Sequence, residues 1–237
     1  MRLHTTTTST CAACRLVDLC LPYGLQENEV EQLSTIIKKK RPLQSDQYLY
    51  AQGDDGESLY AVKSGSFRSF ITSSEGVEQT IGFYLPGELM GLDVLKSGRF
   101  TSSIVALETA SVCELPLSHL KALCATIPSL QTQLIRILGK EICSDQDKIL
   151  LLGHRSAKAK IATFLLMLSI RYGALGFSNT HFNLSMRRHD IANFLGLTIE
   201  TVSRQLAELN KHGIISVKRR SIQINDLELL KSIVEPT

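Results

Sequence analysis

The sequence predicts an α+β chain with three successive parts: an antiparallel β-roll, a long helix with a coiled-coil seam, and a winged helix-turn-helix. Three observations support this prediction. Short β-branched and aromatic runs alternate with glycines between about residues 45 and 120. A repeat of apolar residues at spacings of three and four follows Pro128. Beyond it, an amphipathic helix begins near Thr198, directly after a glycine turn.

The length of 237 residues exceeds that of most single domains, and an apolar content of 43% can fill more than one core. We divide the chain into a cysteine-rich arm (1–24), a β-roll (25–128), a dimerisation helix (129–155) and a winged helix-turn-helix (156–237). The net charge of +3 is unevenly distributed. Residues 157–237 carry 11 Lys and Arg against 6 Asp and Glu, and residues 1–156 carry 15 against 17. The positive excess therefore lies in the part with the helix-turn-helix, as binding to phosphates requires.

The N-terminal sequence favours an intracellular protein. Met1-Arg2-Leu3-His4 and the threonine run after it contain no apolar segment of a signal peptide. No stretch approaches the roughly 20 apolar residues of a membrane span. We therefore expect a cytoplasmic protein with no membrane partner. Cysteines that cluster in this compartment suit metal binding or redox chemistry better than structural disulfides.

Three of the six cysteines lie within ten positions of the arm: Cys11, Cys14 and Cys20. A fourth thiolate would come from Cys113, Cys124 or Cys143. The spacing leaves open an iron–sulfur cluster, a zinc site, or redox thiols. Zinc sites usually pair two Cys-x2-Cys or Cys/His knuckles, whereas only one is present here. A cluster accepts looser spacings. We expect Cys124 and Cys143 to be packing residues.

Residues 45–120 predict the β-roll. The candidate strands are Ser58–Val62, Phe67–Ile71 and Thr80–Tyr84, and the turns contain Gly65, Gly76 and Gly87. An amphipathic helix is predicted before them, from Glu27 to Lys38. Short strands joined by glycine turns are typical of an antiparallel roll or barrel.

The long helix is predicted from Pro128 to about Leu152. Its repeating positions are Leu134, Leu138, Ile142, Asp145, Ile149 and Leu152. This spacing indicates a seam that a second copy would cover, so we expect a symmetric homodimer. The alternative is that the helix only covers the roll.

Asp145 is the polar member of this seam. A carboxylate there would meet its own mate across the two-fold axis, where like charge and desolvation both oppose association. Alternatively, Asp145 lies just off the seam and stays hydrated. If Asp145 lies on the seam, Asp145 and the neighbouring Ile142 would form a dimer switch. A modest signal could then shift the equilibrium between monomer and dimer.

The C-terminal part predicts a helix-turn-helix. The first helix is Arg188–Leu195, Gly196 makes the turn, and the Thr198 hydroxyl caps the second helix. At about 100° per residue, one side of the second helix carries Val202, Leu206 and Leu209. The other side carries Glu200, Ser203 and Arg204, whose groups pair with base edges in the major groove.

A basic wing follows the second helix. Gly213 ends that helix, and Ile214–Val217 and Ile222–Ile224 predict two short strands. Lys218 and Arg219 lie between the strands and are candidate phosphate contacts. An ordinary surface helix would need neither the glycine turn nor the wing, so we predict double-stranded DNA as a partner.

An enzyme is a weaker interpretation. An iron–sulfur enzyme or electron carrier would need paired acid and base groups, and the sequence offers no such His/Asp/Glu constellation. His181, His189 and His212 lie in or beside the helix-turn-helix and suit its surface. We therefore expect a protein that is not an enzyme.

The order of these parts resembles the fumarate and nitrate reduction regulator family, the oxygen-sensing branch of the CRP/FNR superfamily. The resemblance includes the Cys-x2-Cys-x5-Cys arm, the glycine-rich roll and two longer motifs, Asp145–Leu152 and Leu195–Arg204. It extends from about Cys11 to Ile224, nearly the whole chain. It implies a roll similar to cyclic-nucleotide-binding domains, and a 4Fe–4S cluster on Cys11, Cys14, Cys20 and Cys113.

The resemblance also implies a mechanism. With the cluster, family members form a dimer that binds palindromes of the TTGAT…ATCAA type, and oxygen destroys the cluster and the dimer. Glu200, Ser203 and Arg204 match the reading positions, with Arg204 matching the guanine partner, and Asp145 matches the seam acid. The family contacts RNA polymerase through roll loops, for which the Ser73–Glu78 turn is the candidate here.

Two departures from the superfamily pattern bear on function. Gln205 stands beside the reading face where an apolar residue is expected. Relatives that bind cyclic nucleotides place an Arg-Ser or Arg-Thr pair after a Gly-Glu turn. Here Gly87-Glu88 is present, but Phe100 follows Arg99. We therefore expect no cyclic nucleotide as a ligand.

Overall fold

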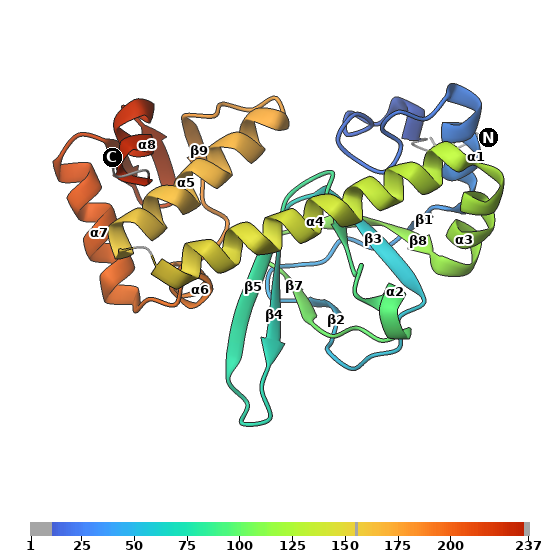
Figure 1. The fold of residues 1–237 in the computed structure, drawn as a ribbon, viewed down its shortest axis with the longest axis horizontal. Helices are drawn as coiled ribbons and strands as arrows, with labels where there is room; N and C mark the ends of the chain where they lie inside the picture. The colour runs from blue at the N-terminus through green and yellow to red at the C-terminus, as the bar shows by residue number, and fades with distance from the viewer. Residues whose placement is uncertain (1–10, 155, 235–237) are drawn as a thin grey trace, which may run out of the picture.

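The computed structural model describes residues 11–154 and 156–234, so the threonine run of the arm lies outside the described residues. The predicted α+β fold class is confirmed: a β-roll, a long helix and a helix-turn-helix domain follow one another (Figure 1). Within the described ranges, no helix combines the length and apolarity that a bilayer crossing requires.

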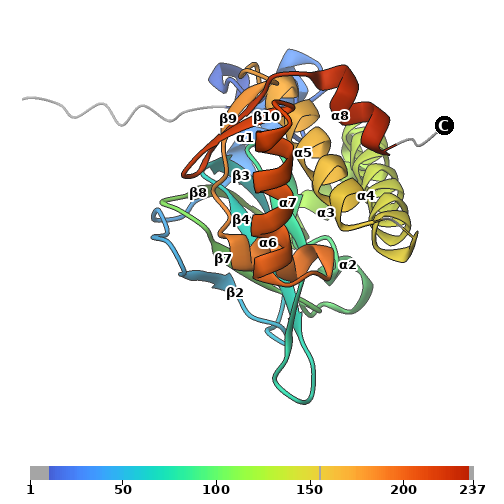
Figure 2. The same cartoon turned by 90° about the vertical axis from the view of Figure 1, so that its left-hand side faces the viewer.

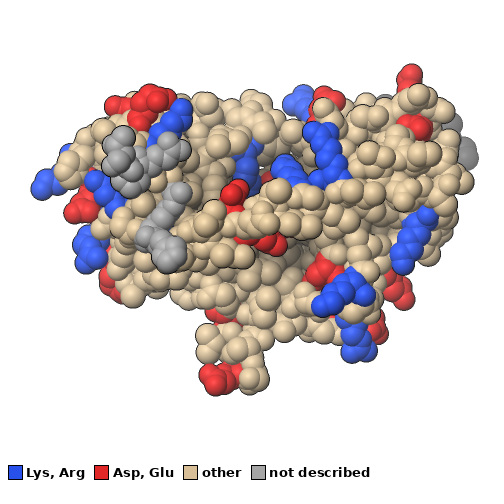
Figure 3. Space-filling model, viewed as in Figure 1, with Lys and Arg blue, Asp and Glu red and all other residues tan. Residues whose placement is uncertain are grey.

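The roll consists of two four-stranded antiparallel sheets, in the orders β1-β8-β3-β6 and β2-β7-β4-β5. Its strands are β1 (Lys38–Lys39), β2 (Tyr48–Tyr50), β3 (Ser58–Ser64), β4 (Phe67–Thr72), β5 (Glu78–Tyr84), β6 (Leu89–Met90), β7 (Ser103–Ala106) and β8 (Ser111–Pro116). The side chains of Leu59, Phe67 and Leu115 are fully buried between the sheets. β4 and β5 form a long hairpin that projects away from the body (Figure 1 and Figure 3).

Short helices cover one end of the roll: η1 (Cys11–Ala13), α1 (Glu27–Ile36), α2 (Val94–Ser97) and α3 (Leu117–Thr126). Helix α1 ends at Ile36, slightly earlier than predicted. The cause is strand pairing, because Lys38 and Lys39 form β1 opposite Glu114 and Cys113 of β8. The arm and α1 lie beside the first half of the long helix (Figure 1).

The long helix α4 (Pro128–His154) runs across the whole molecule (Figure 1). The predicted seam is wrong at its first position. Leu134 packs against the roll core, whereas its neighbour Ile135 is 61% exposed. A second row of α4 carries Ile135, Leu138, Ile142, Asp145, Ile149 and Leu152, at spacings of three and four, and all but Ile135 line an open cavity of about 900 Å³ beside the roll. We call these six residues the outer stripe.

The C-terminal domain contains α5 (Ala157–Ala174), β9 (His181–Asn183), α6 (Arg188–Leu195), α7 (Ile199–Lys211), β10 (Ile215–Lys218), β11 (Ser221–Ile224) and α8 (Leu227–Val234). The three strands form a sheet in the order β10-β11-β9. Gly196 ends α6 in the left-handed conformation at φ 61°, which turns the chain toward α7. The domain lies at the end opposite the arm, and Figure 2 views that end with α7 in front.

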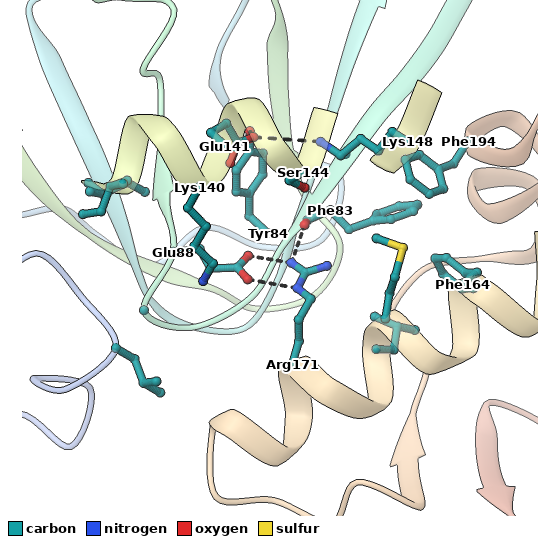
Figure 4. A pocket seen from close by; sticks show the side chains of 17 residues that line it. Phe83, Tyr84, Glu88, Lys140, Glu141, Ser144, Lys148, Phe164, Arg171 and Phe194 are labelled. Atoms are coloured by element: carbon teal, nitrogen blue, oxygen red, sulfur yellow. Dashed lines mark hydrogen bonds and ion pairs between the residues drawn. The ribbon is translucent and has the colours of Figure 1, made fainter. Parts of the chain in front are cut away.

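The roll and the C-terminal domain share a core. The ring of Phe83 in β5 packs edge-on against Phe164 of α5 and Phe194 of α6, with centroids 6.0 and 5.2 Å away. Beside these rings, Arg171 of α5 binds Glu88 of the roll through two hydrogen bonds of 2.9 and 2.5 Å. Figure 4 shows this pair in a cavity of about 160 Å³ between the roll, α4 and α5.

Candidate cysteine centre and DNA interface

The four cysteines predicted as ligands line one small cavity. Cys11, Cys14 and Cys20 come from the arm, and Cys113 comes from β8. The cavity has a volume of about 40 Å³ and is otherwise lined almost entirely by apolar side chains. About one hundred residues separate the arm from β8, so the fold brings together thiols that the sequence leaves far apart.

Local contacts hold the arm in this position. The backbone N–H of Cys11 donates to the Ser34 hydroxyl of α1 at 3.1 Å. A Cβ placed on Gly87 would lie 3.1 Å from the Cβ of Leu19, so the arm lies directly on this turn of the roll. The Arg136 guanidinium of α4 stacks on the Tyr23 ring at 4.7 Å. The arm therefore contacts α1, the roll and the long helix α4.

The thiols are held in a desolvated environment. Burial raises the pKa of Cys20 to about 12, and the neighbouring cysteines add to this effect. Burial also raises the pKa of Cys11 and Cys113. The proton is thus retained in the metal-free arrangement, and binding of a cationic centre would have to displace it.

The donor set fits an iron–sulfur cluster. Four thiols are the ligand set that such clusters take. Among the described residues, no group of three or more His, Cys, Asp or Glu side chains is close enough to hold a single metal ion. The four thiols share one cavity lined mainly by apolar side chains.

Lys63 is a cavity residue that the sequence analysis did not identify. It is the one charged side chain among the described residues that line the cysteine cavity. It lies in β3, whose register pairs Ala61 with Cys113 of β8. No local pattern marks Lys63, because the pairing of β3 with β8 joins segments about fifty residues apart.

The two remaining cysteines behave differently from each other. Cys124 is half-buried and packs against the roll core, as predicted. Cys143 is exposed on α4, so the prediction that it packs in a core is wrong. The helix turns this position away from the roll, whereas its neighbour Ser144 lines the interdomain cavity.

The reader helix α7 has the two faces that its sequence predicts. Val202, Leu206 and Leu209 are buried in the domain core, and Glu200, Ser203 and Arg204 are exposed. The Thr198 hydroxyl caps the helix by accepting from the Thr201 N–H at 3.2 Å. Hydrogen bonds from its own backbone N–H and from Thr198 lower the pKa of Glu200, so it is a carboxylate acceptor at neutral pH.

Gln205 lies beneath this face with its side chain 9% exposed. Its Oε1 is buried and has no hydrogen-bond partner among the described residues. An unpaired buried amide oxygen is unfavourable by about 1–3 kcal/mol. The departure noted at this position therefore lies in the packing of α7 and not on its reading face.

The wing presents a cluster of cations. Lys218, Arg219 and Arg220 are all exposed at the turn between β10 and β11, where Lys218 pairs with Ser221. Arg219 has a φ of 58°, which is uncommon for a residue with a side chain.

Glu88 and Arg99 stand in the region where relatives that bind cyclic nucleotides have the Gly-Glu turn and the Arg-Ser or Arg-Thr pair. Both residues have partners within the protein here. The Glu88 carboxylate accepts from Arg171 and from the Leu85 N–H. Arg99 is exposed and pairs with Asp55 at 3.1 Å, and Phe100 is buried. The charged groups of this region are therefore committed to pairs within the protein.

Comparison with known proteins decides the family. A cyclic nucleotide-binding domain matches residues 40–127, and a Crp-like helix-turn-helix domain matches residues 159–233. The anaerobic regulatory protein of Haemophilus influenzae is 45% identical over 92% of this chain and 84% of its own. The fumarate and nitrate reduction regulatory protein of Escherichia coli K12 is 42% identical over 96% of this chain and 91% of its own.

The chain belongs to the fumarate and nitrate reduction regulator family. FixK2 from Bradyrhizobium japonicum has a similar structure, with a TM-score of 0.77 and 29% identity over 85% of this chain and 99% of FixK2. Like the family, the chain is an anaerobic DNA-binding transcription regulator and not an enzyme. This excludes the iron–sulfur enzyme or electron carrier considered from the sequence.

Proposed function

We propose that this regulator responds to oxygen through a 4Fe–4S cluster on Cys11, Cys14, Cys20 and Cys113. The observation that carries the proposal is the gathering of these four thiols, and no other cysteine of the described residues, around one cavity. When bound, the cluster would supply four iron–thiolate links between arm and roll, together with sensitivity to oxygen.

The contacts of the arm connect the cysteine centre to helix α4. Tyr23 stacks under Arg136 of α4, and Leu19 lies on the turn that contains Gly87. Fixing the arm on the roll fixes both contacts. We propose that α4 then pairs with a second copy through the outer stripe, with Ile142 and Asp145 as the switch near its centre. Ile142 is 60% exposed in the single chain, which is unfavourable until a partner covers it.

The dimer would read a palindrome of the TTGAT…ATCAA type. Each subunit would place α7 in one of two successive major grooves about 34–36 Å apart. Glu200, Ser203 and Arg204 are assigned to base edges, and Lys218 and Arg219 to phosphates. The Ser73–Glu78 turn, at the tip of the β4–β5 hairpin, is assigned to RNA polymerase.

We retain the four-part division of the chain at residues 24, 128 and 155 as part of this proposal. The arm (1–24) would carry three ligands, the roll (25–128) the fourth, the helix (129–155) the dimer contact, and residues 156–237 the DNA contact.

Metal analysis and DNA binding test the proposal together. Protein purified without oxygen should contain about four iron and four acid-labile sulfide per chain. It should bind the palindrome, and air should remove both the cluster and the binding. Zinc without sulfide would indicate a zinc-based regulator. Protein that contains neither iron nor zinc would indicate a thiol-based regulator. DNA binding that survives air would contradict oxygen sensing.

A further inference from the structure

The first helix of the helix-turn-helix is bonded to an edge strand of the roll. β5 is the last strand of its sheet, so the backbone groups on its outer side have no neighbouring strand. Asn193 of α6 occupies this side. Its Nδ2 donates to the Glu78 carbonyl at 2.8 Å, and its Oδ1 accepts from the Thr80 N–H. One side-chain amide thus satisfies a donor and an acceptor that a further strand would otherwise pair.

The contact is reciprocal and specific in register. The Gln79 side chain donates from Nε2 to the Asn193 carbonyl at 2.7 Å. Three hydrogen bonds therefore join one residue of α6 to three consecutive residues of β5. A shift of α6 along the strand by one residue would break all three, because neighbouring strand residues present their groups in opposite directions.

A second anchor lies one turn earlier on the same face of α6. The Asp190 carboxylate is 3.7 Å from Arg68 of β4, and the two side chains are only 10% and 12% exposed. The other Asp190 oxygen accepts from the Arg187 N–H at 2.8 Å and so caps α6. Arg68 also binds Glu78 at 2.9 Å, which ties this anchor to the same strand edge. Residues three apart on a helix face the same way, so both anchors point toward the roll.

The reading face remains free in this arrangement. α6 packs its apolar residues into the domain core, including Ile191 and Leu195. Arg204 is exposed on α7, and α7 lies in front when the C-terminal end of the molecule faces the viewer (Figure 2). The docking contact therefore involves none of the DNA-reading groups, and its strand residues Gln79 and Thr80 line the same open cavity as the outer stripe.

We propose that Asn193 and Asp190 are positioning residues for DNA recognition, which hold the helix-turn-helix against the β4–β5 edge at the orientation that palindrome reading needs. This inference rests on the proposed reading of a palindrome by two α7 helices. Such reading requires a fixed separation and direction of the helices.

The apolar contacts and the polar contacts have different roles here. The rings of Phe83, Phe164 and Phe194 bring the domains together, as Figure 4 shows. Such packing is largely non-directional. The hydrogen bonds of Asn193, together with those between Arg171 and Glu88, have strict distances and angles, so they select one orientation among those that bury the rings.

The variant Asn193→Ala in the full-length, anaerobically prepared protein tests the proposal. Duplexes would carry TTGAT and ATCAA half-sites whose separation varies by single base pairs. Wild-type protein should prefer one separation. We expect the variant to lose affinity for that duplex on the order of tenfold, and to discriminate less between separations. Hydrogen exchange at the Thr80 amide should become faster, while dimerisation measured by sedimentation stays unchanged.

Two further variants separate docking from folding. Asn225→Ala removes an amide that bonds only within the C-terminal domain, to Gly213 and Ser216, and should keep the preferred separation. Gln79→Ala removes one bond from the roll side and should change the preference in the same direction as Asn193→Ala, by less.

Unchanged binding by Asn193→Ala, beside a wild type that requires the palindrome, would overturn this inference alone. An unchanged exchange rate at Thr80 would do the same. A wild type that binds a single half-site as tightly as the palindrome would overturn the proposed function as well.

Discussion

The Asp145 carboxylate lies 2.8 Å from the Lys148 ammonium on the same helix, and 61% of the Asp145 side chain is exposed. This pair forms on the outer stripe, between Ile142 and Ile149. In the single chain, water and Lys148 therefore both stabilise the charge. A partner helix that covered the stripe would remove the water and bring a second Asp145 close.

We expect Asp145→Ala to strengthen dimerisation in protein that lacks the cluster. The substitution removes the like charge and the desolvation penalty from the seam. The dimer dissociation constant should fall on the order of tenfold, which corresponds to about 1.4 kcal/mol. Sedimentation of aerated protein measures this. The control is Asp147→Ala, an exposed acid off the stripe, which should leave the constant unchanged. An unaltered monomer fraction in Asp145→Ala would count against the switch.

The effect of a cysteine substitution on iron content should depend on whether that cysteine lines the cavity. Cys113→Ser should reduce iron and acid-labile sulfide to near zero, because the proposed cluster needs all four of the thiols that line the cavity in the described part of the chain. Cys124→Ser is the matched control, since Cys124 is also half-buried but does not line the cavity. It should keep wild-type iron content. Equal iron loss in both variants would indicate a general folding defect and would contradict the ligand assignment.

The sequence predicted the local features of the fold and missed those that depend on distant pairing. The faces of α7 follow from helical periodicity, and the turn at Gly196 follows from the need for a positive φ. The predicted seam of α4 begins at Leu134, one residue before the exposed Ile135. Leu134 and Ile135 are both apolar, and only the position of the roll decides which one is covered.

Distant pairing explains the residues that the sequence could not reveal. Lys63 reaches the cysteine cavity because β3 pairs with β8. Asn193 looks like an ordinary polar residue of a short helix. Its bonding role arises because β5 is an edge strand, and strand order is not readable from local spacing.

Substitutions of residues assigned to base edges and of residues assigned to phosphates should differ in their effect on sequence specificity. Arg204→Ala should weaken binding by about 1–3 kcal/mol and relax preference at one base pair of each half-site, since a bidentate pair to guanine is lost. Lys218→Ala should weaken binding to all sequences alike and lower the salt slope by about 1. Competition with half-site variants at several salt concentrations separates the two. Preference retained in Arg204→Ala would refute the assignment of the reading face.

The pH dependence of stability should reveal Glu141, whose carboxylate lies between Tyr84 and Lys148 at the interdomain cavity (Figure 4). Burial raises the pKa of Glu141 above its ordinary value of 4.5, and Lys148 opposes this only in part. The folded protein therefore binds a proton that the unfolded chain releases. Stability from this group falls as pH rises from 4.5 through the raised value, and the loss is complete above it.

Glu141→Gln should abolish that dependence. The variant should gain stability relative to wild type as pH rises through this window, and the gain should level off near neutrality. Urea unfolding of both proteins across a pH series measures the difference. A difference between Glu141→Gln and wild type that is constant with pH would mean that the pKa of Glu141 is the same in the folded and unfolded protein, so that Lys148 fully offsets its burial, and would contradict the prediction.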